Sequence, residues 1–167
     1  VWTDTALTSM RFIGPPFTFG LQQLSSNTTI MSPNAAVATE DFVFWMGIDT
    51  FYVYAGQTQT LPCTVKDKVF LDFNLTQKDK VIAGVNSEFS EVTWFYPSAS
   101  SSDNDKYVTY NYGEKVWYFG TLSRTAWLDR GTRNFPIATG SNLIYNHEIG
   151  YDLSLIHISE PTRRLNI

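Results

Sequence analysis

Residues that could carry acid, base or metal chemistry are few, and their spacing matches no catalytic motif. His147 and Glu148 are adjacent, but the second His of a zinc-protease helix is missing, and the pair falls at the end of an expected strand. Asp103, Asn104 and Asp105 offer oxygen ligands for calcium without the Gly and distal Glu of an EF-hand loop. We therefore expect a loop histidine near the rim of the fold and a solvated hairpin tip.

Carboxylate pairs give a weak hydrolase signal. Glu88 with Glu91, or Asp129 with Glu148, could flank a glycosidic bond, but the sequence alone does not give their separation. The chain has neither a phosphate-binding Gly-rich loop nor a Gly-x-Ser-x-Gly motif. Its single cysteine excludes a disulfide or a Cys-based zinc site within the chain. These observations predict a non-enzymatic protein with no catalytic residue, cofactor or metal.

Aromatic side chains have two interpretations. Trp45, Trp94, Trp117 and Trp127 could form a sugar-stacking platform, with Trp94 and Tyr107 beside the polar segment 97–106 as the stacking residues. Such side chains more often pack between neighbouring sheets, because each buries a large apolar area. We favour the core interpretation.

Three arginines lie close together in the sequence. Arg124, Arg130 and Arg133 surround a turn that also contains Asp129. A salt-bridged turn is the simpler interpretation, and a contact with another subunit or with DNA is the alternative. The formal net charge of −4 argues against a DNA-binding surface along the whole chain, because phosphate binding needs clustered Lys and Arg.

The segment 41–62, DFVFWMGIDTFYVYAGQTQTLP, best shows how the chain is organised. Two aromatic, β-branched runs flank the turn signal 47–50, and a more polar third strand follows. This pattern predicts an antiparallel meander. Segments 1–3 and 7–12 suggest a hairpin, 12–20 with its tandem Pro a rigid crossing whose Phe side chains pack down as a lid, and 97–106 an exposed, mobile loop.

One short helix is expected over 65–73. Val65, Val69 and Phe73 recur four residues apart with charged residues between them, and Thr64 could cap the N-terminus. The rest of the chain favours strands: aromatic residues make up 16% of the sequence and hydrophobic residues 43%. No apolar run approaches the roughly 20 residues of a membrane span.

Similar strands recur along the chain. If Val1, Val43, Val92 and Phe135 mark the first strand of each meander, the repeat length is that of propeller blades. We therefore predict an all-β protein of antiparallel meanders, an incomplete β-propeller of three to four blades, with a β-sandwich as the competing fold.

Both ends of the chain are unusual. Val1 begins inside an apparent strand, and 153–163, LSLIHISEPTR, corresponds codon by codon to a sequencing-library adapter. We expect 1–152 to be a partial propeller domain truncated at both ends and 153–167 to be a non-native read-through tail. A native amphipathic tail is the alternative.

Four segments resemble tail-associated virion proteins of short-tailed bacteriophages: VWTDTALTSMRFIGPPFTFG, DFVFWMGIDTFYVYAG, TLSRTAWLDRG and LIYNHEIGYD. The resemblance is to propeller-bearing tail nozzle or hub proteins and packaged-DNA stabilisation proteins, and it covers most of 1–152. It implies a homo-oligomeric ring below the portal, contacts with other tail and portal proteins, at most transient DNA contact, and retention of packaged DNA until ejection. It also implies location in the virion tail after assembly in the bacterial cytoplasm.

The resulting functional hypothesis is a structural tail component. An acidic conduit would repel phosphate and let DNA pass. The alternative is a receptor- or glycan-binding module, and a hydrolase with carboxylates in a propeller channel is a third possibility.

Overall fold

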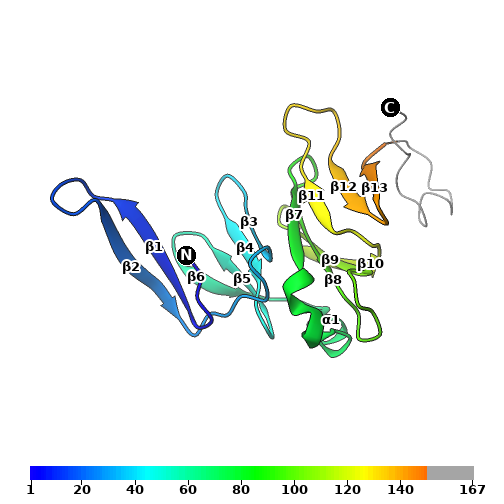
Figure 1. The fold of residues 1–167 in the computed structure, drawn as a ribbon, viewed down its shortest axis with the longest axis horizontal. Coiled ribbons are helices and arrows are strands. Elements are labelled where there is room, and N and C mark those ends of the chain that lie inside the picture. The colour runs from blue at the N-terminus through cyan, green and yellow to red at the C-terminus, as the bar shows by residue number, and fades with distance from the viewer. Residues whose placement is uncertain (150–167) are drawn as a thin grey trace.

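Antiparallel sheets make up most of the computed structural model, which describes residues 1–149 (Figure 1). An N-terminal hairpin pairs β1 (Ala6–Phe12) with β2 (Phe19–Ser26). Three meanders follow, here called blades. Blade 1 contains β3 (Ala36–Ala38), β4 (Val43–Met46), β5 (Phe51–Tyr54) and β6 (Thr58–Leu61). Blade 2 contains β7 (Ile82–Asn86), β8 (Glu91–Tyr96), β9 (Lys106–Asn111) and β10 (Val116–Thr121). Blade 3 contains β11 (Ala126–Leu128), β12 (Ile137–Gly140) and β13 (Leu143–Asn146).

The four sheets stand side by side in chain order. In Figure 1 the hairpin, blade 1 and blade 2 follow one another from left to right, and blade 3 lies above blade 2. The first strands of successive blades are neighbours, since β7 contacts β3 on one side and β11 on the other. Successive meanders with adjacent first strands are the arrangement of blades in a propeller, and the sheets of residues 1–149 form no closed barrel. The predicted all-β fold of antiparallel meanders is confirmed.

Blade 1 is buried on both faces because both sets of alternating side chains are apolar. Phe44 and Phe51 face blade 2, whereas Trp45 and Tyr52 face the N-terminal hairpin. The predicted turn at 47–50 joins β4 to β5, and the Gly47 amide donates to the Thr50 carbonyl at 2.8 Å. Two-sided burial explains why this segment has the strongest strand signal in the sequence.

Aromatic rings fill the space between blades 1 and 2. Trp94 has 0% exposure, and its ring centroid lies 4.9 Å from that of Phe51 and 6.0 Å from that of Trp117. Its indole nitrogen donates to the Ala35 carbonyl at 3.0 Å, which satisfies the one polar atom of the side chain. The core interpretation of Trp94 is confirmed.

The four positions used to measure the repeat, Val1, Val43, Val92 and Phe135, do not mark the first strands of the meanders. Val43 begins β4, Val92 lies in β8, and Phe135 precedes β12 by two residues. Val1 lies outside the named strands. The strands β3 and β11 have three residues each, too few for an alternation that would mark them as the starts of meanders.

The predicted pairing of 1–3 with the start of 7–12 is confirmed in part: Trp2 bridges Leu7, and the Thr8 amide donates to the Val1 carbonyl at 2.8 Å. The longer ladder of β1 is with β2, which the sequence did not predict. The Pro15–Pro16 pair lies at the hairpin tip, where missing amide donors cost no ladder bond. Phe12 is 72% exposed, so the segment 12–20 is no lid.

Two short helices follow blade 1. The helix α1 (Lys66–Leu71) is shorter than the expected 65–73, and a 3-10 helix, η1 (Leu75–Lys80), follows it. Thr64 is not the cap of α1: the N-cap position is Val65, with no side-chain hydrogen bond. Val69 is buried among the core residues, as its place in the apolar stripe predicts.

The middle of the segment 97–106 is exposed, as predicted, but its two ends are held by hydrogen bonds. Asp105 accepts hydrogen bonds from the Ser98 amide at 2.7 Å and the Ser98 hydroxyl at 2.6 Å. The buried Asn104 amide donates to the Lys80 and Arg124 carbonyls. The two Asn104 partners lie 24 and 20 residues away in sequence, so local composition could not reveal them. The predicted adapter tail at 153–167 lies outside the described residues, as does the domain boundary at 152.

Candidate functional site

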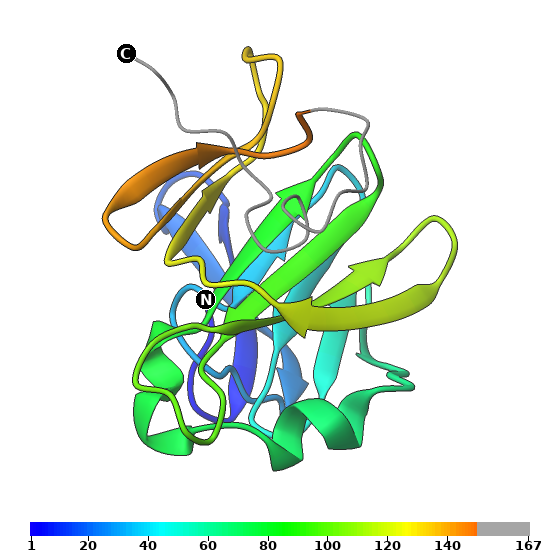
Figure 2. The same ribbon diagram turned by 90° about the vertical axis from the view of Figure 1, so that its right-hand side faces the viewer.

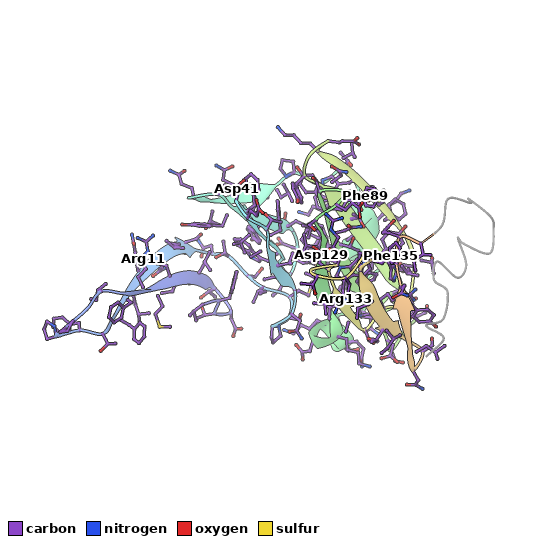
Figure 3. All side chains as sticks on the ribbon, turned by 90° about the horizontal axis from the view of Figure 1, so that it is seen from above. Arg11, Asp41, Phe89, Asp129, Arg133 and Phe135 are labelled. Carbon is purple, nitrogen blue, oxygen red and sulfur yellow. The ribbon has the colours of Figure 1, made fainter. Side chains whose placement is uncertain are left out.

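The three arginines predicted to cluster are separated in the structure. Arg124 is buried, whereas Arg130 and Arg133 lie on the exposed loop between β11 and β12. Viewed from above, Arg133 lies beside Asp129 and Phe135, across the molecule from Arg11 on the hairpin (Figure 3). A single basic patch formed by all three arginines is therefore wrong.

Arg124 takes part in an interior cluster. Its Nε donates to Nε2 of His147 at 2.9 Å, and its guanidinium carbon lies 4.2 Å from the centroid of the Tyr145 ring. Burial lowers the pKa of Arg124. Burial, followed by the Arg124 charge, lowers the pKa of His147 from 6.5 to about 3. His147 is thus a neutral, buried acceptor, and the expectation of a rim histidine was wrong.

In the β11–β12 loop the salt-bridged interpretation holds for Arg130, with Glu88 rather than Asp129 as its partner. Arg130 pairs with Glu88 at 3.1 Å. The Asp129 carboxylate accepts from the Arg130 amide at 2.8 Å and from the Ser87 amide at 3.3 Å. Arg133 is exposed, so it remains accessible to a partner. These contacts tie the loop to the turn between β7 and β8.

Neither glycan-stacking candidate presents a free ring face. Trp94 is fully buried, so its part in the stacking prediction was wrong. Tyr107 is half-buried, packs beside Phe95, and crowds the backbone of Gly120. Segment 97–106 therefore carries no Trp–Tyr platform.

A cavity of about 210 Å³, here called the interblade cavity, lies between blades 2 and 3. In Figure 2 blade 3 covers one side of blade 2, and the β9–β10 hairpin extends past its edge. The cavity wall on blade 2 follows from the strand register. Asn86 pairs with Glu91, and Thr93, Thr109 and Tyr118 form one cross-strand row.

The wall on blade 3 is formed by residues near the first and last strands of that sheet. Trp127 stacks on Phe95 at 5.9 Å and contacts the His147 ring at 4.6 Å. Its indole nitrogen donates to the Val85 carbonyl at 2.8 Å. Gly84 is required opposite this ring, because a Cβ there would come within 2.4 Å of Trp127. Glu148 also lines the cavity, with part of the residue open to solvent and part removed from it.

Acceptors outnumber donors in the interblade cavity. The Asn86 amide nitrogen donates to Glu148 at 3.3 Å, and the Tyr118 hydroxyl hydrogen-bonds Glu91. Burial raises the pKa of Glu148, and the Glu91 and Glu88 carboxylates raise it further. Burial, followed by the interaction with Glu91, also raises the pKa of Tyr118. The cavity thus concentrates negative charge without a cation of its own among the residues that line it.

The predicted carboxylate pairs are not the ones that share this cavity. Glu88 forms an ion pair with Arg130, and the Asp129 carboxylate accepts hydrogen bonds from the Ser87 and Arg130 backbone amides. Glu91 and Glu148 come together instead. One sequence signal pointed to this surface: Tyr107, Thr109 and Asn111 alternate with Val108 and Tyr110, which predicts a more polar face of β9. The pairing of Asn86 with Glu91 had no local signal.

The N-terminal hairpin has an uncovered apolar face. Cross-strand pairs place two sets of side chains on one side of the hairpin, and all four members are exposed: Phe12 with Phe19, and Met10 with Leu21. The opposite side has the pairs Ser9 with Gln22 and Arg11 with Gly20. In Figure 1 this half of the hairpin stands away from the blades.

Comparison with protein-family models and with curated proteins found no match. Within residues 1–149, no group of three or more His, Cys, Asp or Glu side chains could hold a metal ion. No helix in that part of the chain is long and apolar enough to cross a membrane.

Proposed function

We propose that the chain is a structural component of a bacteriophage tail, part of a nozzle or hub that retains packaged DNA and lets it pass at ejection. In this role the protein acts through contact area and shape, as a member of a homo-oligomeric ring that contacts other tail and portal proteins. The proposal rests on the resemblance of the four quoted segments and on one structural feature, the hairpin.

The apolar face of the hairpin is the observation that supports an assembly role. Four large side chains, Met10, Phe12, Phe19 and Leu21, are each more than half exposed. An exposed apolar surface of contiguous side chains is typical of a contact with another protein. We assign its occupant as a second copy of the chain, because head-to-tail contacts generate rings when the rotation closes.

Charge is consistent with a DNA conduit. The formal net charge of −4 repels phosphate, and the arginines are dispersed rather than clustered. Arg124 is buried and Arg130 is paired with Glu88, so Arg133 is the member of that predicted set left for a transient DNA contact. We place the protein in the virion tail.

Recovery of the intact gene with its neighbours tests the proposal. Adjacent portal and terminase genes are the expected result, because tail and packaging genes of phages are grouped. A neighbourhood of sugar-metabolism genes would contradict the phage assignment and favour the glycan-binding alternative. In the glycan-binding alternative Trp94 cannot stack on a sugar because it is fully buried, and Tyr107 is half-buried.

A further inference from the structure

We propose that the interblade cavity binds a guanidinium or primary ammonium group. The proposal goes beyond the tail function, because it concerns a specific ligand site and does not depend on which assembly contains the protein. Its basis is the set of unmatched acceptors that blades 2 and 3 bring together.

An unpartnered acceptor lies in the cavity wall. Asn86 is 4% exposed, and within residues 1–149 its side-chain oxygen has no hydrogen-bond partner. A buried polar atom without a partner costs free energy unless a ligand or water supplies the missing bond. Because this atom is a carbonyl oxygen, the missing partner is a donor.

Two carboxylates require the same kind of partner. Glu148 accepts from the Asn86 amide and Glu91 accepts from the Tyr118 hydroxyl, which leaves each carboxylate with unused acceptor positions. The nearest cations are engaged elsewhere: Arg130 pairs with Glu88, and Arg124 donates to His147. A cationic group with several N–H donors would serve both carboxylates and the Asn86 oxygen.

Size and aromatic content agree with this chemistry. A volume of about 210 Å³ is below that of drug-sized ligand pockets, which are roughly 300–1,000 Å³, and suits a group of side-chain size. Tyr107, Tyr118 and Trp127 line the cavity, and aromatic rings attract cations. The Thr93 and Thr109 hydroxyls, which also line the cavity, are hydrogen-bonded to each other at 2.8 Å and do not need a bond from the ligand.

The cation could be a free small molecule or the side chain of a bound protein. Titration of the full chain with propylguanidinium, followed by amide NMR shifts, measures the free cation. Titration with a blocked Gly-Arg-Gly peptide measures the side chain. Saturable shifts at Asn86, Glu91 and Trp127 are expected with both probes. Stronger binding of the peptide would identify a protein partner, and stronger binding of propylguanidinium would identify a small molecule.

Three controls make the test decisive. Glu148→Gln should weaken propylguanidinium binding about tenfold, the loss expected for one charge-assisted hydrogen bond. Glu114→Gln removes the same charge from an exposed turn outside the cavity and should leave binding unchanged. Neutral propylurea should not bind. Absence of saturable shifts at millimolar cation, equal binding of propylurea, or equal effects of the two Glu variants would overturn the proposal. Amide spectra of both variants verify that they are folded.

Discussion

His147 shows how burial and a neighbouring charge change the chemistry of a residue. The sequence places it beside Glu148, where it could be mistaken for an acid–base group. In the structure its Nε2 accepts from Arg124 and its ring lies against Trp127. Protonation would bury a second positive charge beside the guanidinium, so the folded protein keeps this imidazole neutral.

The depressed pKa of His147 predicts loss of stability in acid. The unfolded chain takes up a proton near pH 6.5, whereas the folded protein does so near pH 3, so stability present above 6.5 is lost as the pH falls toward 3. At pH 5 this single group should lower the unfolding free energy by about 2 kcal/mol. Urea unfolding at pH 7 and pH 5 measures the loss. His147→Gln should remove this contribution to the difference in unfolding free energy between pH 7 and pH 5. An unchanged pH dependence in the variant would show that the pKa of His147 is not lowered by folding.

Trp94 provides the second prediction at this scale. Its replacement by Ala should lower the unfolding free energy by about 3–5 kcal/mol, because the ring is fully buried among aromatic neighbours. Phe89→Ala, at an exposed turn, should cost less than about 0.5 kcal/mol. Chemical denaturation of the two variants gives both values. A small effect of Trp94→Ala would contradict its place in the core.

At the level of elements, the N-terminal hairpin has two halves with different roles. The proximal half is anchored to blade 1, where Leu7 packs with Trp45 and Tyr52. The distal half carries the exposed pairs Phe12–Phe19 and Met10–Leu21. One strand pair thus combines an attachment surface with an uncovered surface, which is why we assign it to assembly.

This division predicts that two similar Leu→Ala substitutions lower the unfolding free energy by very different amounts. Leu7→Ala should cost about 2–5 kcal/mol of unfolding free energy, because Leu7 is 5% exposed. Leu21→Ala should cost less than about 0.5 kcal/mol, because Leu21 is 71% exposed. Thermal or urea unfolding of dilute protein measures both. Equal costs would mean that the distal half is packed against the body of the protein.

Local patterns in the sequence predicted local structure well. The turn at 47–50 and the meander around it follow from residue type and alternation over a few positions. The tandem Pro segment was interpreted as a crossing because Pro disrupts a ladder, although a hairpin tip accommodates Pro equally well.

The candidate site could not be predicted in the same way. Its members come from the strands β7 to β11 and from the segment after β13, and the register that brings Asn86 to Glu91 depends on tertiary packing. The partners of Asn104 and His147 are likewise far away in sequence. Asn104 donates to the Lys80 carbonyl, and His147 accepts from Arg124, in each case more than twenty residues away. Non-local contacts of this kind leave no periodic signal in one sequence.

At the scale of the whole molecule, the sheets follow one another and each is stabilised by its neighbours. Blade 1 is covered by the hairpin on one face and by blade 2 on the other, and blade 2 is covered in turn by blade 3. The apolar half of the hairpin extends beyond this stack. From that surface we propose a structural role in a ring, and occupancy of the surface by a second copy is the central claim.

Sedimentation velocity of the full chain over a range of concentrations tests that claim most directly. The wild-type protein should show reversible, concentration-dependent association, because burying Met10, Phe12, Phe19 and Leu21 against another copy removes apolar area from water. The double variant Phe12→Ser, Leu21→Ser should remain monomeric, whereas Gln22→Ser, on the opposite face of the same hairpin, should associate as the wild type does. A monomeric wild-type protein at every concentration, or association that persists in the double variant, would contradict the account.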